Sequence, residues 1–359
     1  DVGVALIGHR FMGRAHSNAY RQVGPFFSPR LKPRMKVLCG RNPKAVRQAA
    51  DGRKPPSSRT GGYCRARARL PLSMVQALTR ESARALSARA PCAWRWRGRT
   101  VKLLDGTGLS MPDTAENQAH FPQPSCQAEG VGFPQLRLCA VLDLASGALL
   151  EAASGPHQGA GHSELDLSRT LLSAFSKGDL LLADALYAHY FLVAQLIEAG
   201  VDVLLKQHGS RHTDFRRGRR LGVRDHVVHW PKPHTRPGWM TREQYNAFPA
   251  QICMREVKVG GRILVTTMRD AAAVNKAELH ALYRRRWNIE LAFGSLKTTL
   301  GMDVLRCRTP QMIEKELWVY LLAYNLIRLL MAQAAVQSGQ LPQQLSFKHT
   351  VQLWNAWTS

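Results

Sequence analysis

Residues 281–297 read ALYRRRWNIELAFGSLK, and this stretch decides how the rest of the sequence is interpreted. At about 100° per residue in a helix, four polar residues fall within one arc of about 60°. They are Tyr283, Arg286, Glu290 and Lys297, and apolar residues fill the neighbouring arc. The pattern predicts a helix over about 276–299 that holds a carboxylate at the edge of a buried surface. The alternative is a solvated stripe in which Arg286 and Glu290 form an i,i+4 pair worth only tenths of a kcal/mol.

Two aspartates come directly after short apolar segments elsewhere in the chain. Asp105 follows Val101–Leu104, and Asp184 follows Leu180–Ala183. Both segments are predicted to be buried strands that end before the aspartate. In α/β sheets ligands collect at the carboxyl ends of strands, so both residues are candidates for a functional site. For either aspartate alone, the alternative is a loop-capping role.

The chain from residue 100 onwards has the pattern of an α/β domain. Further strands are predicted at 136–144, 148–153, 201–205, 225–230, 254–259 and 262–268, and helices at 74–90, 164–175, 188–199 and 312–336. Residues 206–272 are rich in strand and turn signals. A group of polar residues matches no metal-binding spacing and is predicted to form a surface loop and a helix cap: His157, His162, Glu164 and Asp166.

The spacing Tyr283-x2-Arg286-x3-Glu290-x6-Lys297 resembles the Tyr–Arg–Glu–Lys signature of the insertion-sequence-four group of DDE transposases. The segments around the two aspartates are similar to that group as well: Leu104-Asp105-Gly106-Thr107 and Asp184-Ala185-Leu186-Tyr187. The resemblance runs from about residue 64 to the C-terminus.

This resemblance implies an α/β fold, with a ribonuclease-H-like catalytic core over residues 100–340 and a strand-rich insertion at about 206–272. It implies that Asp105, Asp184 and Glu290 are an acidic triad that binds two Mg²⁺ ions, with Mn²⁺ as a substitute. Carboxylate oxygens suit such hard cations, and a metal pair can clamp an in-line phosphoryl displacement on DNA. The resemblance further implies that Tyr283, Arg286 and Lys297 contact DNA phosphates.

The expected partners are double-stranded DNA, both transposon ends and target, and a second copy of the chain in a synaptic dimer. Trp230 or Trp239 is expected to stack on a flipped base. The expected location is the bacterial cytoplasm, in association with the nucleoid.

Lys+Arg 50 against Asp+Glu 25 gives a net charge of +25, which favours a polyanionic partner. No membrane partner is expected, because the most apolar run, Leu321–Met331, is interrupted by Asn325 and Arg328 and falls short of the roughly 18 residues needed.

The first 51 residues have a different character. A strand at Val2–Ile7, a turn at Gly8–Gly13, a helix at Ala15–Val23 and a strand at Met35–Cys39 are predicted. Together they resemble the start of the cofactor domain in the glucose–fructose oxidoreductase and inositol dehydrogenase family. This predicts a truncated Rossmann-like unit, since the further strands that would form a dinucleotide-binding crevice do not follow.

Residues 52–99 are predicted to be an Arg-rich linker with a partial helical region. The first 100 residues carry 22 Lys and Arg against three acidic residues. The run Trp94–Arg99 alternates aromatic and cationic groups, which indicates either a DNA contact or a solvated basic loop.

We hypothesise a fused reading frame, formed when an insertion sequence entered a dehydrogenase gene. Two alternative functions follow: a catalytically inactive DNA-binding fusion fragment and a nicotinamide-dependent oxidoreductase. The seven cysteines form no C-x-x-C pair, so neither a disulfide framework nor a zinc site is predicted.

Overall fold

The computed structural model describes residues 2–7, 33–39, 61–128, 130–159 and 161–357. In the N-terminal part, β1 (Val2–Ile7) and β2 (Pro33–Cys39) form a parallel pair. Both strands were predicted from the sequence. The predicted turn at Gly8–Gly13 and helix at Ala15–Val23 lie outside the described residues, as does most of the predicted linker before residue 61.

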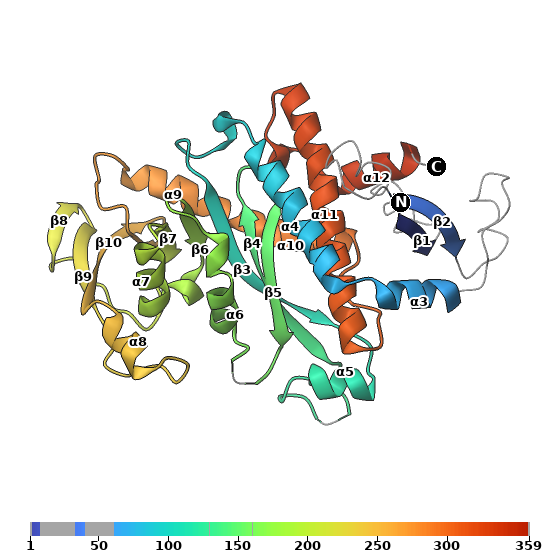
Figure 1. The fold of residues 1–359 in the computed structure, drawn as a ribbon. Coiled ribbons are helices and arrows are strands. Elements are labelled where there is room, and N and C mark those ends of the chain that lie inside the picture. Colours follow the sequence, from blue (N-terminus) through green and yellow to red (C-terminus); the bar gives the residue numbers. More distant parts are fainter. Residues whose placement is uncertain (1, 8–32, 40–60, 129, 160, 358–359) are drawn as a thin grey trace.

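One nine-stranded sheet organises the rest of the described chain (Figure 1). Its strands, in spatial order, are β5 (Leu149–Pro156), β4 (Gln135–Asp143), β3 (Val101–Ser110), β6 (Leu180–Ala183), β7 (Asp202–Lys206), β11 (Arg262–Thr266), β10 (Gln251–Val259), β9 (Asp225–Pro231) and β8 (Arg219–Gly222). β6 runs parallel to both β3 and β7, and the other neighbouring pairs are antiparallel.

Helices cover both faces of this sheet. One face carries α9 (Lys276–Arg284), α10 (Asn288–Gly294), α11 (Pro310–Ser338) and α12 (Phe347–Trp357), and the other carries α6 (Glu164–Thr170) and α7 (Tyr190–Glu198). In β6, Leu180 and Leu182 pack into the first core and Leu181 and Ala183 into the second. Burial on both faces explains why this strand is apolar throughout. The shorter helices are α3 (Gly61–Arg69), α5 (Ala115–His120) and α8 (Arg242–Ala247).

The strand-rich region at 206–272 continues the main sheet. β11 pairs with β7 over three residues, from Leu264↔Lys206 to Thr266↔Leu204. Beyond β11, the strands β10, β9 and β8 extend the sheet to one end of the molecule (Figure 1). The predicted strands at 254–259 and 262–268 pair as a hairpin around Gly260-Gly261. Backbone pairing therefore ties the strands of this region to the strands that carry the aspartates.

The segment that precedes β3 is part of the folded body. α4 (Leu72–Ala88) buries Val75 and Leu86 and lies beside α11 and β5 (Figure 1). In the basic run that follows, Arg97 pairs with Glu278 at 2.7 Å and Arg99 with Asp202 at 2.8 Å. Trp94 in the same run is buried. These side chains join α4 to the sheet and α9, so the run packs against the folded body, and a DNA contact by this run stays a prediction.

α11 is the one helix in the described part of the chain that is long and apolar enough to cross a membrane by length and composition. The sequence prediction that no such segment exists therefore needs correction. However, 61% of its most apolar window is buried within the protein. Asn325, which interrupts the apolar run, donates to Leu149 O at 2.9 Å and accepts from Leu149 N at 2.9 Å. These contacts make α11 a core helix that anchors β5.

Candidate active site

Asp105 and Asp184 lie next to each other at the end of the parallel pairing between β3 and β6. The last pair in that ladder is Leu104↔Ala183, so the two aspartates are the next residues on adjacent strands. The sequence interpretation ended the first strand at Leu104, and that boundary is wrong. β3 continues to Ser110 because its antiparallel pairing with β4 persists beyond Asp105.

The predicted polar stripe of the helical segment 276–299 lies next to Asp105 and β3. Arg286 donates from Nη1 to Asp105 Oδ2 at 3.1 Å and from Nη2 to Glu290 Oε1 at 2.5 Å. Lys297 Nζ donates to Gly108 O on β3 at 3.0 Å. Through these bonds the structure brings Asp105, Arg286, Glu290 and Lys297 into direct contact with one another or with β3.

The helix itself departs from the regular geometry predicted from the sequence. α9 is followed by a 3₁₀ turn at Arg285–Trp287, then α10, then a π-helical turn at Ser295–Thr299. Such irregular turns change the angle between successive side chains and are often found at functional sites. The 100° periodicity still identified the correct face, because Arg286, Glu290 and Lys297 all point towards β3 and its neighbours.

Tyr283 differs from the other stripe residues because it is only 4% exposed and packs in the main core. Its side chain hydrogen-bonds with Arg286. Tyr283 therefore lies on the core side of Arg286, which separates it from the predicted carboxylates. The neighbouring Trp287 is 57% exposed and was not singled out in the sequence.

Negative charge is concentrated around Asp105. Burial, together with the charges of Asp184 and Glu164, raises the pKa of Asp105 to about 6, against the opposing effects of the Gly106 N–H and Arg286. Burial and Asp184 likewise raise the pKa of Glu164, against Arg137. Such a group of carboxylates is stabilised by a nearby cation, and in this structure Arg286 supplies that positive charge.

Among the described residues, no three His, Cys, Asp or Glu side chains are close enough together to hold a metal ion. The reason is visible in the contacts: the Arg286 guanidinium lies between Asp105 and Glu290. The donor type nevertheless suits Mg²⁺, which prefers carboxylate oxygens, and Arg286 links two of the three predicted carboxylates. Gly106 leaves room for the Glu164 side chain, because a methyl group there would come within 2.6 Å of Glu164 Cδ.

Glu164 packs against β3, a contact that the sequence interpretation did not anticipate. Ser163 and Asp166 do form the predicted helix cap at the start of α6, but Glu164 turns towards Gly106 on β3. The signal in the sequence was weak, because a Glu in the first turn of a helix is ordinary. Its position becomes informative only once α6 is seen to cross from β5 to β6, at the end of the sheet that carries both aspartates.

The two tryptophans proposed for base stacking differ in accessibility. Trp230 is 1% exposed, donates from Nε1 to Glu256 at 2.8 Å and has Arg211 3.9 Å above its ring. No base can reach that ring in this structure, so Trp230 is excluded. Trp239 is 44% exposed, with Arg169 4.0 Å from its ring centroid.

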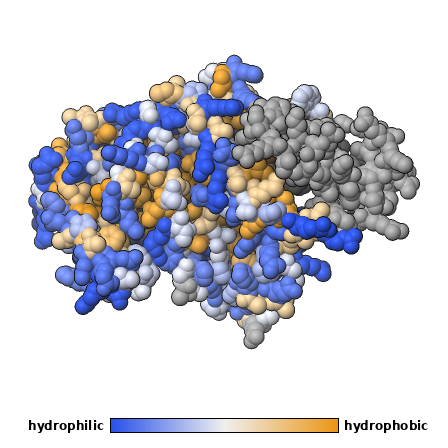
Figure 2. Space-filling view, viewed as in Figure 1, coloured by the Kyte–Doolittle hydropathy of each residue, from blue (hydrophilic) through white to orange (hydrophobic). Residues whose placement is uncertain are grey.

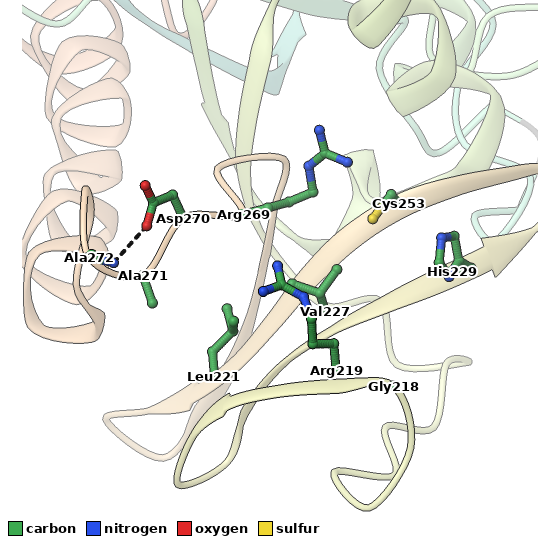
Figure 3. A pocket seen from close by; sticks show the side chains of 10 residues that line it. All are labelled: Gly218, Arg219, Leu221, Val227, His229, Cys253, Arg269, Asp270, Ala271 and Ala272. Carbon is green, nitrogen blue, oxygen red and sulfur yellow. Dashed lines mark hydrogen bonds between the residues drawn. The ribbon is translucent and has the colours of Figure 1, made fainter.

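A cavity of about 700 Å³ opens on the outer strands, away from the aspartates (Figure 3). Arg219, His229 and Arg269 line it together with Cys253 and other residues. Its one acidic lining residue, Asp270, accepts a hydrogen bond from Ala272 N at 2.8 Å. Hydrophilic residues cover much of this end of the molecule (Figure 2), and the exposed arginines there are Arg216, Arg217, Arg219, Arg220 and Arg224.

Asp105→Asn is expected to stabilise the metal-free protein near neutral pH, by about 1–3 kcal/mol. The pKa of Asp105 is about 6 in the folded protein and about 3.9 in an unfolded chain, so the ionised carboxyl is disfavoured by folding. Protonation relieves this cost as the pH falls through about 6, and the advantage of the variant should then shrink. Thermal melts of both proteins in EDTA between about pH 4 and 8 test this. A difference in melting temperature that does not change with pH would contradict it.

Comparison with known proteins agrees with these observations. The family model for the transposase DDE domain matches residues 96–326. Transposase InsG of insertion sequence element IS4 from Escherichia coli (strain K12) is 31% identical over 265 residues, covering 71% of this chain and 58% of InsG. The transposase of insertion sequence element IS421 from Escherichia coli is 34% identical over 71 residues, covering 20% of this chain and 19% of that protein.

Among solved structures, the piggyBac transposase synaptic complex with hairpin DNA aligns with a TM-score of 0.43 and 9% identity, covering 72% of this chain and 52% of that chain. The residues matched by the family model include both aspartates and Glu290, and the likeness to InsG agrees with the resemblance to the insertion-sequence-four group. This chain spans little more than half the length of InsG. The chain belongs to the transposase DDE domain family.

Proposed function

We propose that this protein is a DNA transposase that nicks DNA at transposon ends and joins the freed end to target DNA, with Asp105, Asp184 and Glu290 as its catalytic triad. The observation that carries the proposal is the single guanidinium of Arg286, which contacts Asp105 and Glu290 at once. Asp184 adjoins Asp105 across the β3–β6 pairing. Three carboxylates from two strands and one helix thus share one end of the sheet, within the span of the family match.

The strand order supports a ribonuclease-H-like core. β5, β4 and β3 form an antiparallel meander, and β6 and β7 continue from β3 as parallel strands. Helices lie on both faces of these five strands. In this arrangement the first aspartate lies on the central strand and the second follows the strand beside it.

Each of the site residues would have a separate role in the reaction. Bound Mg²⁺ would supply an activated water and stabilise charge on the leaving oxygen. Asp105, Asp184 and Glu290 would hold that metal site. Arg286 would turn from the carboxylates to a DNA phosphate, because the charge of the metal would replace its own positive charge between Asp105 and Glu290. Lys297, already fixed to β3 by Gly108 O, would hold a second phosphate.

The first displacement breaks the P–O3′ bond at the transposon end and leaves a 3′-hydroxyl. In the second, that hydroxyl attacks a target phosphate, and the target 3′-oxygen leaves. Tyr283 would act from behind Arg286, through the hydrogen bond between them, and reach the terminal backbone only where Arg286 moves away. We further propose a synaptic dimer, which would present two transposon ends together, and action in the bacterial cytoplasm at the nucleoid.

The exposed arginines of the outer strands suit contact with the DNA backbone. Lys and Arg contribute through phosphate neutralisation, without sequence preference. The cavity lined by Arg219 and Arg269 lies within this surface (Figure 3). Residues 1–51 precede the family match, which begins at residue 96, and their dehydrogenase-like pattern plays no part in the proposed reaction.

The proposal is tested with a plasmid that carries the terminal repeats flanking this gene. In Mg²⁺, the wild-type protein should nick at the repeats and produce joined products with a second plasmid. Asp184→Asn should yield neither product, since it removes a metal ligand. If the wild-type protein yields no nicked product in Mg²⁺ or Mn²⁺ while it binds the repeats, the chain is the inactive DNA-binding fragment instead.

Trp239→Ala is expected to weaken binding to a transposon end by about 5- to 100-fold, because stacking on one base is worth about 1–3 kcal/mol. Trp357→Ala is the matched control, since Trp357 is 82% exposed on α12. Fluorescence anisotropy with a labelled end duplex measures both. Equal losses in the two variants would remove Trp239 as the stacking residue.

A further inference from the structure

A cavity of about 420 Å³ lies where the chain leaves the carboxyl ends of β6 and β7. His189, which follows Asp184 and the 3₁₀ turn Ala185–Tyr187, lines it together with His208, which follows β7. Because β6 and β7 are parallel, the segments that follow them meet at one edge of the sheet, where ligands collect in α/β folds. The cavity therefore lies along the same edge as Asp184.

The lining of this cavity is rich in hydrogen-bond donors and cationic groups. It includes His189, His208, Ser210, Arg211 and His212, and none of the described residues that line it is acidic. Burial, together with the positive charges of His208 and Arg211, lowers the pKa of His189. Cations that face one another repel, and an anion between them removes that cost. The cavity is thus suited to a negatively charged ligand.

Arg211 is held in place without the use of its side-chain donors. Its guanidinium lies over Trp230, with Cζ 3.9 Å from the ring centroid, and Trp230 is itself fixed by donating from Nε1 to Glu256 at 2.8 Å. Within the part of the chain that the structure describes, this guanidinium donates no hydrogen bond, and Glu256 attracts it only through its charge. A guanidinium carries five N–H donors in its plane, so stacking leaves them available for a ligand.

The loop that carries Arg211 is fixed by contacts of its own. Gln207, buried after the end of β7, donates from Nε2 to Arg211 O at 2.6 Å, and Arg211 N donates to His208 O at 3.0 Å. Ser210 N donates to His208 Nδ1 at 3.2 Å, so the neutral His208 ring carries its proton on Nε2, where it can be donated. Donors that are positioned in advance lower the cost of binding a ligand.

We propose that this cavity binds one phosphate of the DNA backbone, with Arg211 as its main ligand and His189 and His208 as supporting donors. The inference rests on the proposed function, because DNA that reaches the triad along this edge of the sheet would lie over the cavity. A phosphate suits the paired N–H donors of a guanidinium. The proposal also gives Trp230 a role: the ring that no base can reach is the platform that orients Arg211.

The first test compares Arg211→Gln with Arg84→Gln, which makes the same change of charge at an exposed position on α4. Binding of the full chain to a transposon-end duplex is measured by fluorescence anisotropy between about 50 and 200 mM salt. Arg211→Gln should weaken binding by about 10- to 100-fold. It should also lower the slope of log affinity against log salt by about one unit. Arg84→Gln should change neither quantity.

Arg211→Lys keeps the charge but removes the planar group. It should restore the wild-type salt dependence, since one cation still neutralises one phosphate. It should recover only part of the affinity, because an ammonium group does not donate in fixed pairs or stack flat on Trp230. His189→Gln should cause a smaller loss than Arg211→Gln. The same loss of salt dependence in Arg211→Lys as in Arg211→Gln would overturn the proposal, because a purely structural role of Arg211 would then explain both.

Ethylation of single phosphates in the duplex locates the contact. One ethylated position should weaken binding by the wild-type protein and have no further effect on Arg211→Gln. This non-additivity is expected when a residue and a phosphate act through one contact. An interference pattern that is the same for both proteins would overturn the proposal.

Inorganic phosphate distinguishes a DNA phosphate from a free anion. If it shifts the ring signals of His189 and His208 in nuclear magnetic resonance while Arg211→Gln binds the duplex as the wild type does, the cavity holds a free anion and the proposal is overturned. Nicking at transposon ends, measured alongside, separates this failure from failure of the proposed function. Wild-type affinity in Arg211→Gln with nicking intact refutes the phosphate site alone, whereas a wild-type protein that does not bind the duplex refutes both.

Discussion

Glu290→Gln should abolish Mg²⁺- and Mn²⁺-dependent nicking while leaving DNA binding nearly intact. The substitution removes one metal ligand, and a loss of about 4 kcal/mol in transition-state stabilisation corresponds to about a thousandfold in rate. The amide oxygen can still accept the hydrogen bond that Arg286 Nη2 donates to Glu290 at 2.5 Å. The fold and the phosphate-binding cations should therefore persist. Nicking rates on supercoiled plasmid, together with a DNA-binding isotherm, measure both effects.

Glu116→Gln provides the matched control, because Glu116 is exposed in the first turn of α5. It should nick at the wild-type rate. Nicking at equal rates by Glu290→Gln and the wild-type protein would refute the assignment of Glu290. A parallel loss of DNA binding in Glu290→Gln would instead mean that this side chain supports the DNA-binding surface.

Arg255→Met should destabilise the protein by about 3–5 kcal/mol, the usual cost of leaving one member of a buried ion pair uncompensated. Arg255 is fully buried and donates from Nε and Nη2 to Asp225 at 2.8 and 2.6 Å. It also donates to Val274 O at 2.7 Å, directly before the N-cap of α9. The same side chain thus joins β10 and β9 to the start of α9, the first helix of the segment proposed to carry Glu290. Urea unfolding measures the free energy change.

The double variant Asp225→Leu/Arg255→Met should recover most of this loss, because an apolar pair leaves no buried charge unpaired. Hydrogen exchange should show the single variant opening β9, β10 and the start of α9 together. If the single variant unfolds at the wild-type urea concentration, the outer strands are not coupled to α9 in the way these contacts indicate.

Local patterns in the sequence predicted most of the elements around the site. β6 has the predicted bounds, and the helix with Arg286 and Glu290 has the predicted face towards the sheet. These succeeded because apolar periodicity depends on neighbouring residues alone. The length of β3 was underestimated because its second half is held by pairing with β4, through residues such as Gly106 and Gly108 that have low strand propensity.

Other features depend on contacts between distant parts of the chain. Trp230 and Trp239 are equivalent in the sequence, and only the tertiary partners Glu256 and Arg211 show that Trp230 is buried. The basic run at residues 94–99 suggested a surface for DNA, but its charges meet Glu278 and Asp202 from remote segments. The approach of Glu164 to Gly106 is likewise a long-range contact that local sequence patterns do not reveal.

Mn²⁺ anomalous scattering from crystals of the protein bound to a transposon-end duplex would test the central claim most directly. The account predicts two Mn²⁺ peaks about 3.5–4 Å apart, coordinated by Asp105, Asp184 and Glu290, with Arg286 turned away from the carboxylates towards a DNA phosphate. Mn²⁺ bound elsewhere, with Arg286 still between Asp105 and Glu290 in the DNA complex, would contradict it.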